Sequence, residues 1–196
     1  METLLPLALF AFVSSITPGP NNIMLTSSGI RFGFVRTLPH MAGITIGFGS
    51  LIALCAAGIG SLIVALPWLQ LALRVFASAY LLTLAWQLHR LSIGEAAERQ
   101  VPMSVWGAAT FQFINPKAWM MAITGASAFL PPMQPVVIAV LLLVLVFCAI
   151  NFVCISAWAG AGAALRKHLA QPRWRTLFGN VMAMLTVYAA ASLWLP

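Results

Sequence analysis

The chain has 196 residues, of which 62% are hydrophobic and only 7% are charged, whereas soluble domains average about 45–50% apolar and about 25% charged residues. This composition excludes an ordinary soluble domain and predicts an all-α integral membrane protein. The formal net charge is +7, but the ten Lys and Arg residues are scattered between apolar runs. Membrane topology explains such cations, so the expected surroundings are a lipid bilayer and no nucleic acid.

Six apolar stretches follow one another along the chain, and each is long enough to span a bilayer. They cover residues 4–25, 41–65, 69–89, 104–130, 135–160 and 176–195. Six spans leave no room for a separate soluble domain, so residues 1–196 are expected to form a single membrane unit. The first stretch has neither a basic n-region nor a small-residue cleavage site, and we interpret it as the first helix rather than a signal peptide.

The distribution of cations predicts how these spans are oriented. Eight Lys and Arg residues fall in the loops after spans one, three and five: Arg31, Arg36, Arg90, Arg99, Arg166, Lys167, Arg173 and Arg175. The two termini and the turns near Pro67 and Pro131 carry none. Because positively charged loops stay in the cytoplasm, we expect both termini to be extracytoplasmic.

Span one is interrupted by the stretch Ile16-Thr17-Pro18-Gly19-Pro20-Asn21-Asn22. Proline lacks an N–H and displaces the carbonyl four residues earlier, so the carbonyls of Ser14 and Ile16 are expected to leave the helical ladder. A break within the bilayer is tolerated where it lines a cavity or is buried in protein. The six residues of the break that we interpret as a substrate site are Thr17, Pro18, Gly19, Pro20, Asn21 and Asn22. The alternative is a kink repaired by neighbouring helices, or a loop at the membrane surface.

A second interruption, Ile114-Asn115-Pro116, lies 98 residues after Ile16-Thr17-Pro18 (114 − 16) and opens the second half of the chain. Three-span halves of a six-span protein lie in opposite orientations. The two breaks therefore predict two inverted three-helix repeats, about 1–98 and 99–196, with broken helices one and four. Paired broken segments of this kind indicate a transporter whose substrate site lies between the repeats.

Lys117 follows the second break inside an apolar run, where a cation costs at least about 2.5–3.5 kcal/mol at the helix centre. One interpretation is that Lys117 reaches the membrane interface. The other is that Lys117 and the helix N-terminus beginning at Pro116 bind an anion. Asn115, Pro116 and Lys117 thus join the candidate substrate site. Lys117 is also the first candidate for proton coupling, and His40, at the cytoplasmic entrance of span two, is the second.

Acidic side chains are missing from the spans. The chain has no Asp, and its three Glu residues, Glu2, Glu95 and Glu98, lie at the N-terminus or in a loop. Carbonyls and carboxamides of the first break can hold an α-ammonium group, but nothing offers a counter-charge to a second ammonium. A neutral zwitterion therefore fits better than lysine or arginine.

Other polar and small residues in the spans could either belong to the site or serve helix packing. Tyr80 in span three and Asn151 in span five are secondary site candidates, and an interhelical hydrogen bond explains each equally well. Gly43 and Gly47 form a G-x-x-x-G pair in span two, which we interpret as a helix packing motif.

The two interruptions resemble the lysine-exporter and homoserine/threonine-resistance family of bacterial amino-acid translocators. The resemblance rests on T-P-G-P-N-N at 17–22 and N-P-K-A-W at 115–119, and length and span number agree over the whole chain. The runs G-x-T-x-G at 43–47 and L-C-A-A-G at 54–58 look closest to the cysteine and O-acetylserine exporters. The resemblance implies a secondary transporter that exports small neutral amino acids or derivatives, of the cysteine, O-acetylserine or threonine/homoserine type. It also implies the bacterial inner membrane and the proton-motive force.

Three other classes of membrane protein fit the sequence less well than a transporter does. A thiol-disulfide electron carrier uses paired cysteines, but Cys148 and Cys154 are six residues apart, about 240° around a helix. A pore needs a charged ring or repeated filter, which the sequence lacks. We expect no enzyme, because a serine nucleophile needs a base such as His and the three His lie at segment ends. No cofactor or metal is expected, and homo-oligomerisation is left open.

Overall fold

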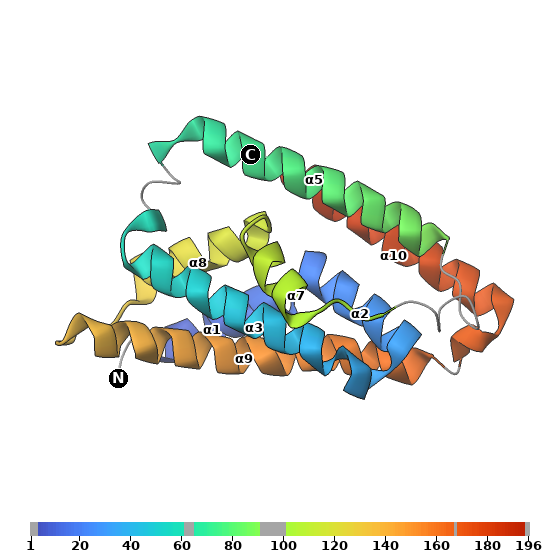
Figure 1. Cartoon of the computed structure of the whole chain (residues 1–196), viewed down its shortest axis with the longest axis horizontal. Coiled ribbons are helices and arrows are strands. Elements are labelled where there is room, and N and C mark those ends of the chain that lie inside the picture. Colours follow the sequence, from blue (N-terminus) through green and yellow to red (C-terminus); the bar gives the residue numbers. More distant parts are fainter. Residues whose placement is uncertain (1–3, 61–64, 91–100, 167, 195–196) are drawn as a thin grey trace.

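The structure, a computed structural model, describes residues 4–60, 65–90, 101–166 and 168–194 (Figure 1). Within these ranges the chain forms eight α-helices and one short 3-10 helix. Their bounds are α1 (Leu4–Ile16), α2 (Pro20–Phe32), α3 (Phe34–Ala56), α5 (Pro67–His89), α7 (Val105–Gln112), α8 (Pro116–Phe129), α9 (Val136–Leu165), η1 (His168–Ala170) and α10 (Pro172–Ser192).

Length and composition show which of these helices could cross a membrane. In the described ranges α3 and α9 are long and apolar enough to cross a bilayer, and the bent pair α1–α2 makes a third span if it is counted as one. The apolar part of α5, Leu71–Trp86, is shorter. The all-helical membrane character predicted from composition is therefore confirmed, whereas the count of six spans stays a prediction.

The structure corrects several predicted boundaries. The first segment continues to Phe32 instead of ending at residue 25, and α3 begins at Phe34 and ends at Ala56 instead of covering 41–65. Hydropathy misses the end of α2 because its residues 22–30 include polar side chains that are all buried in protein. Gly33 joins α2 to α3 with φ of 81°, a conformation that glycine adopts without steric cost.

Both predicted interruptions are present, and they separate α1 from α2 and α7 from α8. The helices α1 and α2 meet at an angle of 56°. In the second half α7 ends at Gln112 and α8 begins at Pro116, which is the first residue of its helix as proline prefers.

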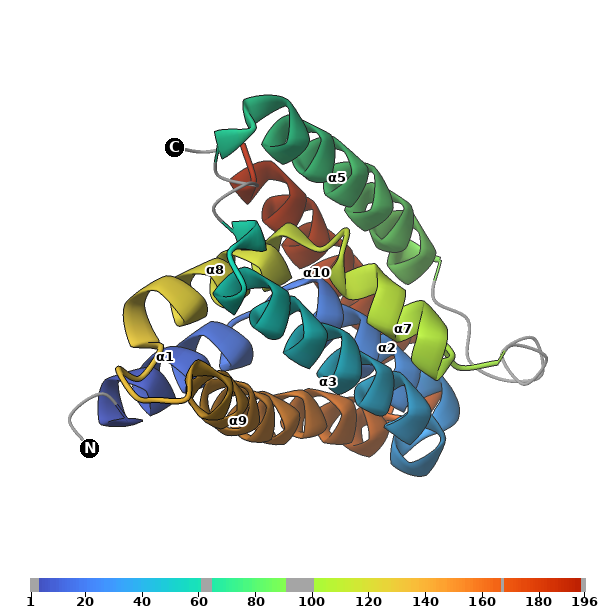
Figure 2. The ribbon, with the colours of Figure 1, turned by 60° about the vertical axis from the view of Figure 1, so that its left-hand side comes forward.

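The helices form a central group and an outlying pair. In the central group α3 and α9 pack against each other, α9 also packs against α1 and α2, and α3 packs against α7 and α8. The helices α5 and α10 pack mainly on one another, and Figure 2 shows them side by side at one edge of the molecule. The largest apolar cluster, which includes Leu7, Phe48 and Phe147, lies inside the central group.

Small residues set the distance between α3 and α7. A Cβ atom at Gly43 would collide with the carbonyl oxygen of Val105, and one at Gly47 would collide with that of Ala109. The interpretation of these two glycines as a packing motif is confirmed.

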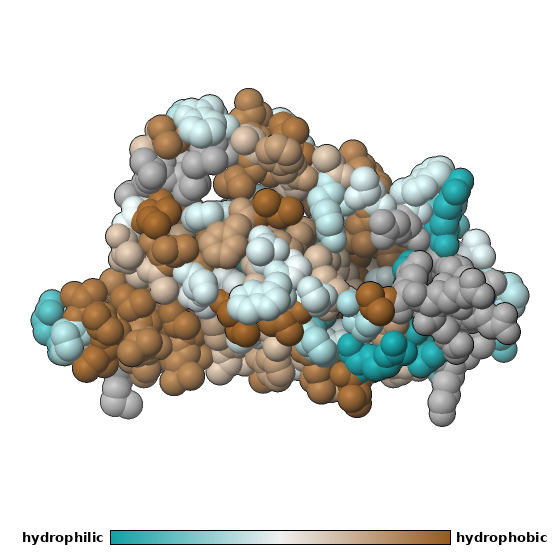
Figure 3. Space-filling model, viewed as in Figure 1, coloured by the Kyte–Doolittle hydropathy of each residue, from teal (hydrophilic) through white to brown (hydrophobic). Residues whose placement is uncertain are grey.

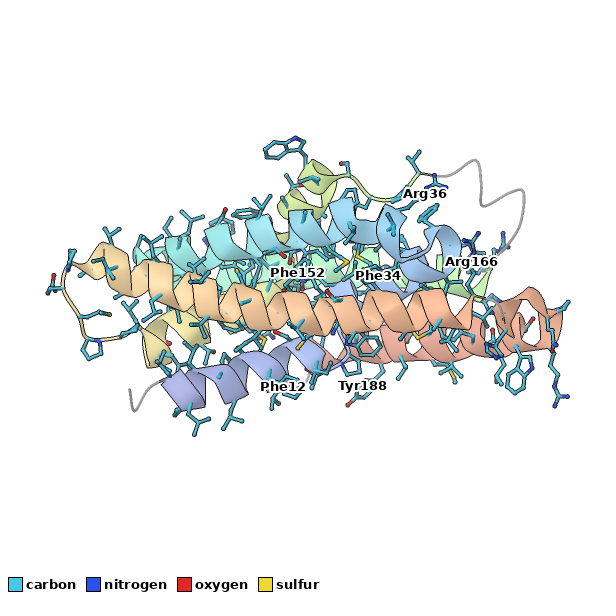
Figure 4. The ribbon with its side chains drawn as sticks, turned by 90° about the horizontal axis from the view of Figure 1, so that it is seen from below. Phe12, Phe34, Arg36, Phe152, Arg166 and Tyr188 are labelled. Atoms are coloured by element: carbon cyan, nitrogen blue, oxygen red, sulfur yellow. The ribbon has the colours of Figure 1, made fainter. Side chains whose placement is uncertain are left out.

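Apolar and charged residues lie on different parts of the outer surface. Apolar residues cover much of the face in Figure 3, and the most hydrophilic residues gather mainly at its right-hand end, with a small group at the left tip. On α9 the side chains of Leu145 and Val153 are 68% and 67% exposed, which suits a surface facing lipid. Arg36 and Arg166 lie together at one end of the molecule (Figure 4). Arg99, Lys167 and the three glutamates lie outside the described residues.

Candidate functional site

The two helix breaks touch each other through Lys117. Its ammonium donates hydrogen bonds to the carbonyl oxygen of Thr17 at 2.7 Å, to the Thr17 hydroxyl at 3.0 Å and to the carbonyl oxygen of Pro18 at 3.2 Å. The Lys117 ammonium is therefore directed at the first break. Its partners are the polar atoms of the other break, an arrangement that neither sequence interpretation anticipated.

Gly19 makes this contact sterically possible. A Cβ atom at Gly19 would lie 2.7 Å from Cδ and 3.0 Å from Nζ of Lys117, closer than real Cβ contacts. The backbone of Gly19 is extended, with φ of −172°, so what matters here is the missing side chain rather than an unusual backbone conformation.

A pair of carboxamides joins the breaks a second time. Asn21 donates from Nδ2 to Oε1 of Gln112 at 2.8 Å, and Gln112 donates from Nε2 to Oδ1 of Asn21 at 3.2 Å. Gln112 also donates to the carbonyl oxygen of Ala108 at 2.9 Å and is fully buried. Gln112 was not predicted as a site residue, although a lone amide at the end of an apolar half-helix is a signal that could have indicated it.

The carbonyls of Ser14 and Ile16 are not open to a ligand, and that expectation is corrected. The Thr17 hydroxyl donates to the Ser14 carbonyl at 3.0 Å, and the indole N–H of Trp158 donates to the Ile16 carbonyl at 3.1 Å. At these two positions the alternative interpretation, repair by nearby groups, holds. It does so because buried backbone groups that lose their helical partner are rarely left unpaired.

Asn22 repairs the rest of the first break. Its Nδ2 donates to the carbonyl oxygens of Ser15 and Thr17, each at 2.8 Å, and the side chain is 3% exposed. The carbonyl of Thr17 thus accepts from both Asn22 and Lys117, and the Pro18 carbonyl accepts from Lys117.

The second break uses its own backbone for most of its hydrogen bonds. The N–H groups of Phe113, Ile114 and Asn115 each donate to the carbonyl three residues earlier, at 3.1–3.2 Å. Oδ1 of Asn115 caps α8 by accepting from the backbone N–H of Lys117 at 3.1 Å. The indole of Trp119 donates to the Phe113 carbonyl at 2.9 Å.

A small cavity of about 20 Å³ lies where the breaks meet, and we call it the central cavity. It has room for about one water molecule. It is lined by Ser14, Ser15, Gly19, Pro20, Asn21, Asn22, Phe48, Asn115, Lys117, Ala118, Met121 and Asn151. Seven of these residues were predicted as site residues, including the secondary candidate Asn151.

Asn151 is the contribution of α9 to the central cavity. Its Nδ2 donates to the hydroxyl of Ser15 at 3.0 Å. Its Oδ1 is buried and has no hydrogen-bond partner among the residues that the structure describes. Ser15 is a site residue that sequence analysis missed, because a serine next to Ser14 in an apolar helix carries no distinguishing local pattern.

Two predicted residues lie elsewhere. His40 and Tyr80 line a second pocket of 260 Å³, together with Arg31 and other residues of α2, and we call it the Arg31 pocket. Tyr80 donates its hydroxyl to Sδ of Met24 at 3.4 Å, and its ring lies 4.6 Å from that of Phe111. The structure therefore divides the predicted site into two regions.

The cysteines do not form a pair. Sγ of Cys148 lies 3.7 Å from the Thr45 carbonyl oxygen on α3, and Sγ of Cys154 lies 3.9 Å from that of Phe12 on α1. These two thiols thus contact different helices, and Cys55, Cys148 and Cys154 are all free cysteines.

Comparison with known proteins decides the family. A family model described as LysE type translocator matches residues 12–195. The chain belongs to this family. The resemblance seen in the two interrupted segments is therefore confirmed, and the chain is a membrane transport protein.

Several relatives are similar to this chain over almost the full length of both proteins. The cysteine/O-acetylserine efflux protein of Klebsiella pneumoniae subsp. pneumoniae is 34% identical over 188 residues, covering 92% of this chain and 91% of the relative. The protein of the same description from Salmonella choleraesuis is 34% identical, with 94% and 96% covered. That of Escherichia coli K12 is 32% identical, with 92% of each chain covered. No solved structure matches the chain significantly.

Proposed function

We propose that the protein is a secondary transporter that exports a small neutral amino acid or amino-acid derivative, of the cysteine and O-acetylserine type, across the bacterial inner membrane. The relatives described as cysteine/O-acetylserine efflux proteins support this substrate class. The observation that carries the proposal is the contact of the Lys117 ammonium with the Thr17 and Pro18 carbonyls.

The Lys117 ammonium occupies the position that suits the ammonium of a substrate. Two carbonyl oxygens and one hydroxyl converge on it within 3.2 Å, and an α-ammonium group makes the same three hydrogen bonds. A substrate that takes this place releases Lys117, which is then free to pair with the substrate carboxylate beside it. Charge-assisted hydrogen bonds between an ammonium and a carboxylate are about twice as strong as neutral ones.

This exchange selects a zwitterion. Every side chain that lines the central cavity is neutral except Lys117, so a bound substrate of no net charge leaves the charge of the site unchanged. A second ammonium on the substrate would meet Lys117 with no carboxylate near it. Lysine and arginine are therefore poor substrates under this proposal.

Proton coupling is assigned to Lys117. It is the ionisable side chain lining the central cavity, and its partners change when the substrate binds and leaves. A cycle in which Lys117 loses its proton after substrate release links transport to the proton gradient. His40 lies in the Arg31 pocket instead, so it is the second candidate.

The packing of the helices supports two inverted repeats at about 1–98 and 99–196. The long helix of each half packs against the broken helix of the other half: α9 against α1 and α2, and α3 against α7 and α8. The third helices, α5 and α10, pack together. Such an exchange of partners is what two related halves around a common site produce.

The positive-inside rule supports the orientation. Arg36 and Arg166 lie at the same end of the molecule (Figure 4), which we assign to the cytoplasm, with both termini on the other side. Reporter fusions at the C-terminus test this, and a cytoplasmic reporter signal would overturn the orientation.

Counterflow in proteoliposomes tests the function. Vesicles loaded with unlabelled O-acetyl-L-serine should accumulate the labelled compound transiently from outside, because a carrier exchanges substrates through one site. Labelled lysine in the same vesicles should not accumulate. Equilibration without a transient overshoot would indicate a pore, and the absence of any flux of O-acetyl-L-serine and cysteine would overturn the proposed substrate class.

A further inference from the structure

The central cavity has an apolar part as well as a polar one. Its large apolar lining residues are Phe48 on α3 and Met121 on α8, and Ala118 lies between Lys117 and Met121 on the same helix. Lys117 and Met121 are four residues apart, so their side chains lie on the same face of α8, one turn from each other. A substrate whose carboxylate pairs with Lys117 therefore has Met121 beside it.

The polar side chains that line the cavity are already held by the protein. Each of them takes part in at least one hydrogen bond within the protein, and they are Ser14, Ser15, Asn21, Asn22, Asn115 and Asn151. Breaking such a bond to make room for an uncharged group is unfavourable, because the separated groups are left without a partner. Apolar side chains have no such bond to lose. An uncharged substrate side chain is therefore placed more favourably against Phe48 and Met121.

Phe48 is a fixed part of this apolar lining. Its ring lies edge-on to the ring of Phe147, with centroids 5.1 Å apart and planes at 89°, an arrangement that aromatic pairs prefer. The ring of Phe147 lies 5.8 Å from that of Phe10, and a Cβ atom at Gly125 would be 3.0 Å from it. Phe48 itself is 2% exposed. These contacts leave its ring little freedom to move away from a substrate.

Met121 is the apolar lining residue that can change its shape. Its side chain is unbranched and adapts to the space beside it, whereas the methyl group of Ala118 has no other rotamer to adopt. Met121 lines the central cavity and also belongs to the largest apolar cluster, together with Leu7, Phe48 and Phe147. It therefore separates the cavity from that cluster. Met121 is 8% exposed, so its side chain can withdraw only as far as the cluster has room.

The size of the cavity makes this movement important. A volume of about 20 Å³ holds about one water molecule, so a substrate has to displace side chains. Lys117 moves in the exchange described for the proposed function, which frees the position of the substrate ammonium. Space for the substrate side chain has to come from Met121, because Phe48 is held by other rings and protein interiors contain few voids. A short side chain needs a small displacement, whereas a longer one drives Met121 into the apolar cluster.

We propose that Met121 sets the upper size limit of the neutral amino acids that the protein exports, because its side chain closes the central cavity against the fixed ring of Phe48. The proposal rests on the proposed function, since it takes the same site and the same class of substrate. It gives that class a physical boundary: the side chain of O-acetylserine is admitted, and a longer ester is excluded.

Two substrates that differ only in length test this limit. The probes are labelled O-acetyl-L-serine and labelled O-butanoyl-L-serine, whose acyl chain is longer by two methylene groups. The measured quantity is the ratio of the initial counterflow rate of the butanoyl compound to that of the acetyl compound, in proteoliposomes of the full chain. This ratio should be low in the wild type. In Met121→Ala it should rise at least about tenfold, because one methylene group in an apolar pocket changes discrimination by about 10–200-fold.

Matched variants separate the size of the side chain from other effects of substitution. Met120→Ala alters the neighbouring methionine, whose side chain is 66% exposed, and should keep the wild-type ratio. Met121→Leu nearly conserves the volume and should also keep it, whereas Met121→Val should give an intermediate ratio. A rise in Met120→Ala or Met121→Leu as large as that in Met121→Ala would overturn the proposal.

The ratio does not depend on how much of a variant folds, because the fraction of active protein affects both rates equally. If Met121→Ala shows no flux, Met121→Val supplies the deciding ratio. An unchanged ratio in the active Met121 variants, or a wild type that carries both esters equally well, would overturn the size limit and leave the transport function intact. Absence of counterflow of O-acetyl-L-serine and cysteine in the wild type would instead overturn the function on which the limit rests.

Discussion

The first and second helix breaks satisfy their backbone groups in different ways. Around the first break the carbonyls accept from side chains on other elements, including Trp158 on α9 and Lys117 on α8. Around the second break three consecutive N–H groups donate to carbonyls of the same turn, and Asn115 caps the helix that follows. The first break is thus held by side chains, and the second is held mainly by its own backbone.

Because of this difference, the hydrogen bonds of the two breaks differ in how easily a ligand can replace them. Side chains can exchange partners with a ligand, whereas a backbone turn cannot release its hydrogen bonds without unfolding locally. Under the proposed function, the first break presents acceptors that a substrate ammonium can take over from Lys117. The second break is a rigid support that presents Gln112 and Lys117 to the first. Two related helix breaks in one chain can therefore differ in how they are stabilised and in what they offer to a ligand.

Removing the charge of Lys117 should break the connection between the two breaks and have the largest effect. Lys117→Gln is expected to reduce counterflow of O-acetyl-L-serine at least about 100-fold, because losing one partner of a buried charge pair costs about 2–5 kcal/mol. Lys117→Arg keeps the cation, so it should retain exchange while losing accumulation driven by a pH gradient. Wild-type transport by Lys117→Gln would end the assignment of the carboxylate to this residue.

Adding a methyl group at Gly19 should displace Lys117 without removing it. Gly19→Ala is expected to lower transport about tenfold, which corresponds to about 1.4 kcal/mol, while the protein remains folded because its conflict is with the flexible end of a lysine. Gly160→Ala is the matched control, since the nearest atom to its Cβ would be Cδ2 of Phe34 at 4.0 Å. Equal rates for both variants would show that the contact at Gly19 has no role in transport.

The asparagine of each break allows a direct comparison of stability. Asn22→Ala removes the donor for the carbonyls of Ser15 and Thr17 and should lower the free energy of unfolding by about 2 kcal/mol. Asn115→Ala removes one helix cap and should lower it by about 1 kcal/mol. Denaturant unfolding in the same detergent measures both values. A larger loss for Asn115→Ala would reverse the view that the first break depends more on side chains.

Substituting the tryptophans at the two breaks should lower the free energy of unfolding least, and by nearly equal amounts. Trp158→Phe and Trp119→Phe each keep an aromatic ring and remove one indole donor to a break carbonyl. Each is expected to lower the free energy of unfolding by about 0.6 kcal/mol, the average for a hydrogen bond between membrane helices. Transport should stay near the wild-type rate. A loss of transport in only one variant would show that its indole has a further role.

The hydrogen-bond network of the site was only partly predictable from the sequence. Proline and asparagine in an apolar run identify an interruption because their chemistry opposes a regular helix locally. Nothing local indicates which distant group repairs it. Lys117 and Thr17 are 100 residues apart, and Asn21 and Gln112 are 91 apart. Gln112 and Ser15 were therefore missed, and the Ser14 and Ile16 carbonyls were wrongly expected to be open.

Composition, the long apolar runs, and the proline and glycine motifs indicated that this chain is a helical membrane protein with two breaks and a closely packed helix pair at Gly43 and Gly47. These properties depend on the solubility and backbone geometry of each residue and its near neighbours, so the sequence carries them directly. The separation of His40 and Tyr80 from the central cavity, and the contact of Lys117 with the first break, were decided by tertiary structure. Several side chains compete for each unpaired backbone group, and only the packing of the helices determines which of them comes within hydrogen-bonding distance.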